Sequence, residues 1–351
     1  MNAPVTAEPL REHRVQEHGW IGLEDEAAWD EAIDAAGADV FHRSWFHRLA
    51  RLRGEGEPQL FVWRTASVLV VVPMLFRDIP GGVGCDVSSV YGYVGPAVRG
   101  APRPGDVAQF RSSLRRALED RGVVSVFSRL HPLRDRRGWI EGLGTLESCG
   151  RTLAVPLTGR SEDDVQSGYR GSHRREIARL RNNGYAVQSE AESVDAFHDL
   201  YAAAMARLGA GSRYTFSPTH LRMLIDDGGM NLLVVRRGAE VAAAGLFTRG
   251  ELGSHYFLSG THPEHRKLAP SKLLVHAGCC WARQRGAAWM HLGGGVGGAQ
   301  DSLFRFKAGF GAQSHAFHTW RWVVDPDRYR WHCARVGAEN SSDFFPAYRR
   351  P

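Results

Sequence analysis

One lysine follows a run of glycines in a way that could hold its ammonium group beside a reacting oxygen. A short apolar strand expected at 288–292 leads into residues 293–298, five of which are glycines, and a short helix then carries Lys307. Closely spaced glycines permit positive φ angles and let a ligand approach the backbone. A fixed ammonium group could stabilise negative charge that develops on such an oxygen. The pattern is equally typical of a plain turn into a capped helix whose lysine complements the helix C-terminus.

Lysine is rare in this chain, which strengthens the case for Lys307. The sequence has 351 residues with 44 lysines and arginines together, but its only lysines are Lys267, Lys272 and Lys307. Arginine therefore provides most of the positive charge behind the formal net charge of +6. This balance is compatible with an RNA or phosphate-bearing partner, and a GC-rich genome would produce the same bias without selection for function.

Composition favours a cytoplasmic globular protein without a metal site. The five cysteines are odd in number and lack metal-type spacing, so we expect free thiols. Residues 1–14 lack the apolar core of a signal peptide, and no apolar run is long enough to span a membrane. No Ser/His/Asp or Cys/His catalytic pattern is visible, so no covalent intermediate is expected. The oligomeric state is left open.

The elements around this segment are expected to form two similar α/β units. Each half is predicted to contain two helices, a hairpin, a further strand, a helix and a strand, in that order. In the first half these are expected at 24–36, 44–52, 59–63 with 68–76, 90–98, 104–121 and 123–127, and in the second half at 194–208, 218–226, 231–236 with 240–248, 252–259, 269–285 and 288–292. A basic helix at 169–182 joins the halves, a last strand follows at 313–324, and the aromatic stretch at 343–348 is expected to dock on the body. The pattern predicts a mixed α/β sheet with flanking helices, divided into residues 1–150 and 151–351.

This order of elements, the segment Asp-Ser-Leu-Phe-Arg-Phe-Lys-Ala-Gly-Phe-Gly at 301–311 and the basic helix together resemble the Fem family. The resemblance covers roughly residues 40 to 325 and extends to relatives described as acetyltransferases. It implies two tandem GCN5-related N-acyltransferase (GNAT) domains. It also implies transfer of an aminoacyl group from aminoacyl-tRNA, as co-substrate without a further cofactor, to a small amine or peptide-like acceptor.

The resemblance implies a catalytic centre at the end of the glycine-rich segment. Lys307 matches the lysine that lies at the catalytic centre in the family, where an ammonium group would stabilise the oxyanion of amide formation. Phe306 would pack or stack nearby, although core packing explains it equally well. Asp301 could orient the amine, but its position as a helix N-cap is a sufficient structural explanation.

The resemblance also implies where substrates bind. Family members hold an anionic acceptor with arginine and tyrosine in the loop after the helix at 194–208, and further contacts come from the first half. A solvated arginine or a packed tyrosine would explain any of these residues as well. The residues expected to contact the acceptor are Arg43, Tyr91, Tyr93, Arg207, Arg213, Tyr214 and Tyr256. Tyr256 is included because it alternates with Ser254 and Leu258 on the strand expected at 252–259, and this face is expected to line the cleft.

The basic helix offers two neighbouring rows of arginines four residues apart, formed by Arg170, Arg174, Arg175 and Arg179. Such rows could follow the phosphates of tRNA. Charge runs of this kind are more often a solvated helix face. Any RNA contact would be small, because the chain has no room for the coiled-coil arm of the full Fem enzymes.

The donor is inferred from the turn where acyl-CoA members of the wider fold bind pyrophosphate. Ala269 and Pro270 stand where spaced glycines would close around phosphates, and proline has no N–H group to donate. We therefore favour an aminoacyl-tRNA-dependent aminoacyltransferase that forms an amide bond in peptide-antibiotic or cell-wall precursor synthesis. The alternatives are an N-acyltransferase that uses acetyl-CoA or another acyl-CoA on an amino sugar or small amine, and a non-catalytic RNA-binding or scaffold protein.

Overall fold

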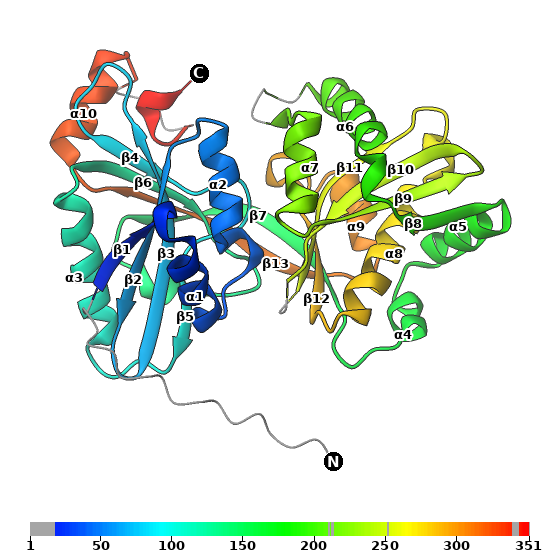
Figure 1. Cartoon of the computed structure of the whole chain (residues 1–351), viewed down its shortest axis with the longest axis horizontal. Helices are drawn as coiled ribbons and strands as arrows, with labels where there is room; N and C mark the ends of the chain where they lie inside the picture. The colour runs from blue at the N-terminus through cyan, green and yellow to red at the C-terminus, as the bar shows by residue number, and fades with distance from the viewer. Residues whose placement is uncertain (1–17, 210, 212–213, 251–252, 339–343, 351) are drawn as a thin grey trace.

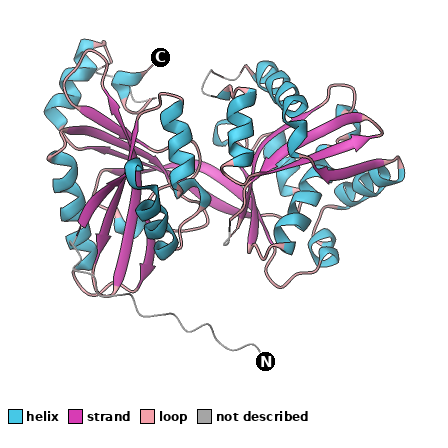
Figure 2. Cartoon of the chain, viewed as in Figure 1, coloured by secondary structure: helices cyan, strands magenta, loops and turns pink. Residues whose placement is uncertain are grey.

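The computed structural model describes residues 18–209, 211, 214–250, 253–338 and 344–350. Within these residues, thirteen strands form one mixed sheet, and helices cover both of its faces (Figure 2). The path through the sheet is β1-β2-β3-β4-β6-β13-β7-β12-β11-β10-β9-β8, with β5 paired to β3. The sheet confirms the predicted mixed α/β class.

The first half contains six strands and three helices in the described residues (Figure 1). Its strands are β1 (His18–Gly22), β2 (Glu57–Arg64), β3 (Val68–Asp78), β4 (Cys85–Ser88), β5 (Ala97–Gly100) and β6 (Val123–Arg129). Its helices are α1 (Glu26–Ala36), α2 (Ser44–Leu52) and α3 (Asp106–Glu119). At the sheet edge, β1 pairs in antiparallel orientation with β2, the first strand of the predicted hairpin, and no strand was predicted at β1.

The second half repeats this order after two short helices. Its strands are β8 (Tyr185–Ser189), β9 (Asn231–Arg237), β10 (Glu240–Phe247), β11 (Ser254–Thr261) and β12 (Trp289–Gly293). Its helices are α4 (Glu162–Ser167), α5 (Gly171–Asn182), α6 (Val194–Leu208), α7 (Pro218–Asp226), α8 (Ser271–Gln284) and α9 (Ser302–Ala308). Strands β4 and β6 pair in parallel in the first half, and β11 and β12 do so at the matching place in the second. The predicted repeat of elements is confirmed.

Two long strands join the halves at the middle of the sheet (Figure 1). β7 (Thr145–Pro156) pairs with β12 and β13, and β13 (Gln313–Val323) pairs with β7 and β6. After α9, β13 thus brings the chain back to the first half. There α10 (Pro326–Arg335) contacts β6. The division into residues 1–150 and 151–351 stays a prediction, and its second part contributes β13 and α10 to the first half.

The segment after α10 also packs on the first half, in agreement with the docking predicted for the aromatic tail. Ala347 and Tyr348 are buried in a cluster with Ile79, Val124 and Cys333. In contrast, the strand expected at 90–98 is wrong over its first part. Only Val94 forms an isolated bridge before β5, because Gly92 and Gly95 have positive φ angles of 135° and 88°.

Candidate active site

Lys307 lies where the two halves of the sheet meet. β12 ends at Gly293, whose φ of 73° lets the chain turn into the glycine-rich loop. Asp301 caps α9 by accepting a hydrogen bond from the Phe304 N–H at 2.9 Å. In the last turn of this helix, Lys307 points back under the loop and its Nζ donates to the Gly294 carbonyl at 2.7 Å. The ammonium group is thereby held in one position.

Lys307 is 9% exposed, and burial lowers the pKa of its ammonium group to about 8, against the opposing effect of Asp301. The glycine at 293 is required by the close approach of two polar groups. A Cβ at Gly293 would lie 3.3 Å from Lys307 Nζ and 3.7 Å from Tyr93 Oη. Tyr93 comes from the first half, so both halves contribute a polar group to this point.

A buried carboxylate and three histidines lie beside Tyr93. Asp39 Oδ2 is 2.6 Å from His131 Nε2 and 2.7 Å from His255 Nε2. His255 Nδ1 is in turn 3.2 Å from His291 Nδ1. The Tyr93 ring stacks on His255 and meets the His291 ring edge-on at 4.8 Å between centroids. We call Asp39, His131, His255 and His291 the histidine cluster.

The hydrogen bonds of the histidine cluster define its tautomers. His131 Nδ1 accepts from the Leu133 N–H at 3.1 Å, so its Nε2–H donates to Asp39. In the neutral form of His255, Nε2–H donates to Asp39 and Nδ1 accepts from His291 Nδ1–H. His291 Nε2 then carries a lone pair, and this buried atom has no hydrogen-bond partner in the described structure. The cluster therefore ends in a hydrogen-bond acceptor without a partner, close to the line where the two halves of the sheet meet. We call this line the seam.

Burial and charge together set the ionisation of the cluster. Burial alone would raise the pKa of Asp39, but the charges and hydrogen bonds of His255 and His131 hold it well below its usual range. Burial lowers the pKa of His291 well below its usual range, and His255 and His131 lower it further. At neutral pH, Asp39 is therefore a carboxylate and His291 is a neutral imidazole.

Two groups of side chains have the spacing of metal ligands within the described residues. In the first, Asp39, His131 and His255, a single carboxylate oxygen accepts both histidine N–H groups, so hydrogen bonds already satisfy the three. In the second, Glu162, His276 and Cys280, the Arg181 guanidinium lies 3.0 Å from His276 Nε2, which disfavours a cation. The expected absence of a metal site stays a prediction.

The chain resembles known proteins in sequence over part of its length and in structure over most of it. Residues 167–307 match the model of the acetyltransferase (GNAT) domain family. The crystal structure of FemX covers 90% of this chain, with 99% of its own chain aligned, at a TM-score of 0.70 and 12% identity. The chain has the Fem-like tandem GNAT fold. The predicted resemblance and fold class are confirmed, and together they support an acyltransferase.

Two further structures share this tandem GNAT fold. L-PGS from Bacillus licheniformis covers 86% of the chain and 92% of its own, at a TM-score of 0.54 and 14% identity. The C-terminal domain of a putative lysylphosphatidylglycerol synthetase from Agrobacterium fabrum covers 86% of this chain and 94% of its own, at a TM-score of 0.52 and 14% identity. A search of curated protein sequences found no match. Among the described residues, no helix is both long and apolar enough to cross a membrane.

The other two residues expected at the tandem GNAT catalytic centre have structural explanations. Asp301 is the N-cap of α9 and also accepts from the Val296 N–H at 3.1 Å, and these backbone hydrogen bonds lower its pKa. Phe306 packs between His173 and Phe310, with ring centroids 5.8 and 5.4 Å away. Both residues position α9, and Asp301 also acts through its charge, which raises the pKa of Lys307 against the effect of burial. Their catalytic roles stay predictions.

Of the residues expected to contact the acceptor, the structure brings Tyr91, Tyr93 and Tyr214 towards the seam. The Tyr91 ring meets Tyr214 edge-on at 5.8 Å and packs on Phe216 and Phe257 of the second half. Burial raises the pKa of both Tyr91 and Tyr93. These aromatic contacts join the loop at 90–95 to β11 and to the segment just before α7.

The remaining expected contacts lie elsewhere. Arg43 forms an ion pair with Asp34, and Arg207 is exposed in the last turn of α6. Tyr256 stacks on Phe247 at 5.3 Å inside the second half, which differs from the expectation that its face of the strand lines a cleft. The neighbouring side chain of His255 faces the seam instead. Arg213 lies outside the described residues.

The basic helix has the exposed face expected of it. Its four predicted RNA-binding residues, Arg170, Arg174, Arg175 and Arg179, are all exposed. Arg174 donates to the carbonyls of Ser167 and Tyr169 at 2.6 and 3.1 Å. The Arg170 N–H donates to the Gly309 carbonyl at 2.8 Å, which connects the start of α5 to the end of α9. RNA binding by this face stays a prediction.

Sequence reasoning missed the histidine cluster. Asp39, His131, His255 and His291 come from four distant segments, and no local spacing connects them. One pattern could have suggested them, because His255 and His291 are polar residues inside strands expected to be buried. A histidine in such a strand needs a hydrogen-bond partner from another segment.

The depressed histidine pKa values predict that stability declines at mildly acidic pH. Burial lowers the pKa of His42 to about 4 and that of His47 to about 3, so both stay neutral in the folded state. The unfolded chain takes up these protons below about pH 6.5, and each such histidine then costs about 1.4 kcal/mol per pH unit. Urea unfolding should give a nearly constant free energy between pH 7 and pH 8 and a decline as the pH falls below about 6.5. Constant stability down to pH 5 would contradict this assignment.

Proposed function

We propose that this chain transfers an aminoacyl group from aminoacyl-tRNA to the amine of a peptide-like, cell-wall-precursor or natural-product acceptor, and forms an amide bond. The GNAT match and the FemX-like fold support an acyltransferase. The fold shared with a putative lysylphosphatidylglycerol synthetase supports an aminoacyl donor. A tRNA donor implies a cytoplasmic setting and needs no further cofactor.

The start of α8 is the observation that carries the choice of donor. Pro270 has no N–H group, and the N–H groups of Ala269 and Lys272 already donate to Arg266 and Ala269 carbonyls at 3.1 and 3.0 Å. Lys272 Nζ is also paired with Glu176. A pyrophosphate binds a helix start through free N–H groups, so this turn is poorly suited to acyl-CoA.

Lys307 has the properties that ester aminolysis requires. The acceptor nitrogen attacks the ester carbonyl carbon, and negative charge develops on the carbonyl oxygen. A fixed, partly desolvated ammonium group stabilises that charge more than it stabilises the neutral ester. With a pKa of about 8, Lys307 is mainly protonated at pH 7. The intermediate then breaks its bond to the tRNA ribose oxygen, which leaves with a proton.

The histidine cluster offers a hydrogen-bond acceptor for the attacking amine. His291 Nε2 carries a lone pair without a partner, and Asp39 holds the tautomers through His255. An acceptor amine near Tyr93 could donate a hydrogen bond to this atom as it attacks. Because the imidazole is neutral, this bond orients the amine lone pair towards the ester carbon.

The exposed arginines of α5 give the donor a route to this centre. Arg170 at the start of α5 is bonded through its backbone to Gly309, two residues after Lys307. Phosphates that follow the arginine rows would therefore bring the 3′ end of a tRNA towards α9. An acyl-CoA donor remains the second candidate, because the matching domain family is described as acetyltransferases.

The donor assay should give RNase-sensitive product. Purified protein is incubated with a panel of amines and either radiolabelled aminoacyl-tRNA from a total charging system or radiolabelled acetyl-CoA. We expect label in the amines only from aminoacyl-tRNA, and loss of that product after RNase treatment. RNase-resistant transfer from acetyl-CoA would replace this proposal by the second candidate. Retention of tRNA without transfer from either donor would favour a non-catalytic RNA-binding protein.

A further inference from the structure

A cavity of about 520 Å³ opens between the first half and the docked tail, away from Lys307. Strands β3, β4, β6 and β13 form one side of it, and Phe344, Phe345 and Pro346 form the other. Four arginines, Arg77, Arg129, Arg321 and Arg349, line the cavity together with Glu55. The cavity therefore combines aromatic walls with an excess of positive charge.

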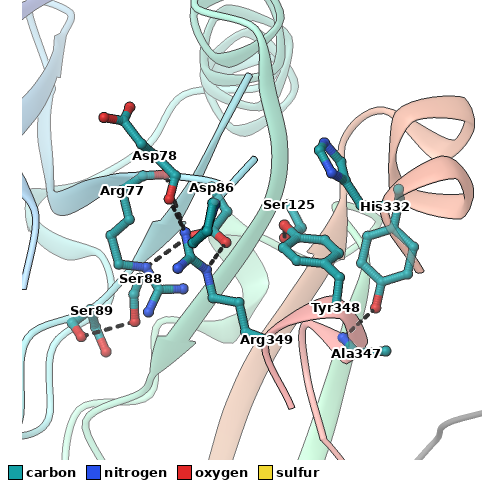
Figure 3. Close-up of polar contacts among 12 residues, drawn as sticks. Arg77, Asp78, Asp86, Ser88, Ser89, Ser125, His332, Ala347, Tyr348 and Arg349 are labelled. Carbon is teal, nitrogen blue, oxygen red and sulfur yellow. Dashed lines mark hydrogen bonds and ion pairs between the residues drawn. The ribbon is translucent and has the colours of Figure 1, made fainter. Parts of the chain in front are cut away.

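The tail wall is held in place by buried polar contacts (Figure 3). Tyr348 Oη and Ser125 Oγ are 2.8 Å apart and buried, and the Ala347 N–H donates to Tyr329 Oη at 3.0 Å. Arg349 donates from Nε to Asp86 and from Nη2 to the Asp78 carbonyl. These contacts fix the tail against β4 and β6, so the cavity is formed before any ligand binds.

The arginines fall into two pairs with different surroundings. Arg77 and Arg349 share Asp86, which is fully buried and accepts from Arg77 Nε at 2.7 Å (Figure 3). Glu55 is paired with Arg53 at 2.9 Å. Asp86 and Glu55, the acidic groups around the cavity, are therefore already paired with arginines.

The charges of Arg129 and Arg321 are not balanced by a neighbouring carboxylate in this way. In the described part of the chain, neither side chain has an ion pair, and Arg321 Nε is a buried atom without a hydrogen-bond partner. The register of β6 and β13 places Arg129 opposite Thr319 and Arg321 opposite Phe127. Arg129 and Arg321 are thus diagonal neighbours on one face, where two like charges repel unless an anion lies between them.

We propose that Arg129 and Arg321 bind the oxyanion group, phosphate or carboxylate, of an organic ligand whose apolar part packs on the aromatic walls of the cavity. The planar guanidinium group suits both oxyanions through paired N–H donors. Tyr91, Phe127 and Phe344 supply the aromatic surface.

The position of Tyr91 connects this site to the proposed function. Tyr91 lines the cavity, and Tyr93 lies two residues further along the chain, at most roughly 7 Å away between Cα atoms. Tyr93 Oη and Lys307 Nζ both lie within 4 Å of the position that a Cβ at Gly293 would take. Resting on the proposed function, we infer that the ligand is the acceptor, with its anionic group in this cavity and its amine directed towards the seam.

The test is a calorimetric titration at constant ionic strength with phenyl phosphate, benzoate and inorganic phosphate. We expect an aromatic oxyanion to bind at least tenfold more tightly than inorganic phosphate, and the better of phenyl phosphate and benzoate identifies the oxyanion. Arg129→Gln and Arg321→Gln should each weaken binding about tenfold or more, because each removes charged hydrogen bonds. Arg99→Gln, an exposed arginine on β5, should leave binding unchanged.

Equal weakening by Arg99→Gln, or undiminished binding by both cavity variants, would overturn the proposal. Arg129→Lys separates recognition from net charge, because it keeps the charge and loses the planar pair of donors. If Arg321→Gln proves unstable in a melting experiment, Arg129→Gln and Arg129→Lys decide the question. No turnover is needed, so failure of binding here is distinguishable from failure of the donor assay.

Discussion

Lys307→Met should lower the rate of acyl transfer about 100- to 1,000-fold while the fold persists. The methionine side chain fills a similar volume but cannot carry the charge that stabilises the oxyanion, and loss of one oxyanion donor typically has this effect. The loss should appear mainly in kcat, because the ammonium acts in the transition state. Transfer from radiolabelled aminoacyl-tRNA to an accepted amine measures it.

The matched control for this variant is Lys267→Met, which removes an exposed lysine on another segment. It should retain full activity and the same melting temperature. The pKa of about 8 adds a second expectation: wild-type activity should lose its Lys307 contribution as pH rises above 8, and that alkaline decline should be absent in Lys307→Met. Wild-type turnover in the Lys307→Met variant would exclude the lysine from the mechanism.

Asp39→Ala should lower the free energy of unfolding by about 3–5 kcal/mol, as expected when one partner is removed from a buried ionic group. The substitution leaves the Nε2–H donors of His131 and His255 buried without an acceptor. It also removes the acceptor of the Val40 N–H, which bonds to Asp39 Oδ1 at 2.6 Å. Urea denaturation at pH 7.5 measures the change.

Asp34→Ala provides the comparison, because Asp34 forms an exposed ion pair with Arg43 five residues before Asp39. An exposed pair contributes at most about 1 kcal/mol, so this variant should be close to wild type. A loss below 1 kcal/mol in Asp39→Ala would show that the histidine cluster does not depend on its carboxylate. Such a result would also remove the basis for the tautomer assigned to His291.

Local patterns account for what could be predicted from the sequence. Helix α7 begins and ends at the predicted residues because Ser217 caps it, through a 3.2 Å bond from the His220 N–H, and Pro218 starts it. Lys307 and the Asp301 cap were found because both belong to one short segment whose geometry is fixed by neighbouring residues. The order of elements followed from alternating periodicities and identified the fold.

Contacts between residues far apart in the sequence could not be predicted from it. Asp39 and His255 are 216 positions apart, and only the folded sheet brings them within hydrogen-bonding distance. Arg129 and Arg321 are neighbours because β13 crosses to β6, a pairing that no spacing in the sequence indicates. The face of β11 that meets the seam was also misjudged, since alternation tells which residues share a face but not which partner that face has.

The pairing of β13 with β6 also determines when the sheet of the first half can be completed during synthesis. Until Gln313–Val323 has been synthesised, β6 is an open edge that can pair with the wrong chain. At ordinary rates of translation, the wait between β6 and β13 is roughly 10 to 40 s. Cells that make this protein must therefore protect an incomplete first half during synthesis, and expressing residues 1–150 alone would leave that exposed edge permanently without its partner.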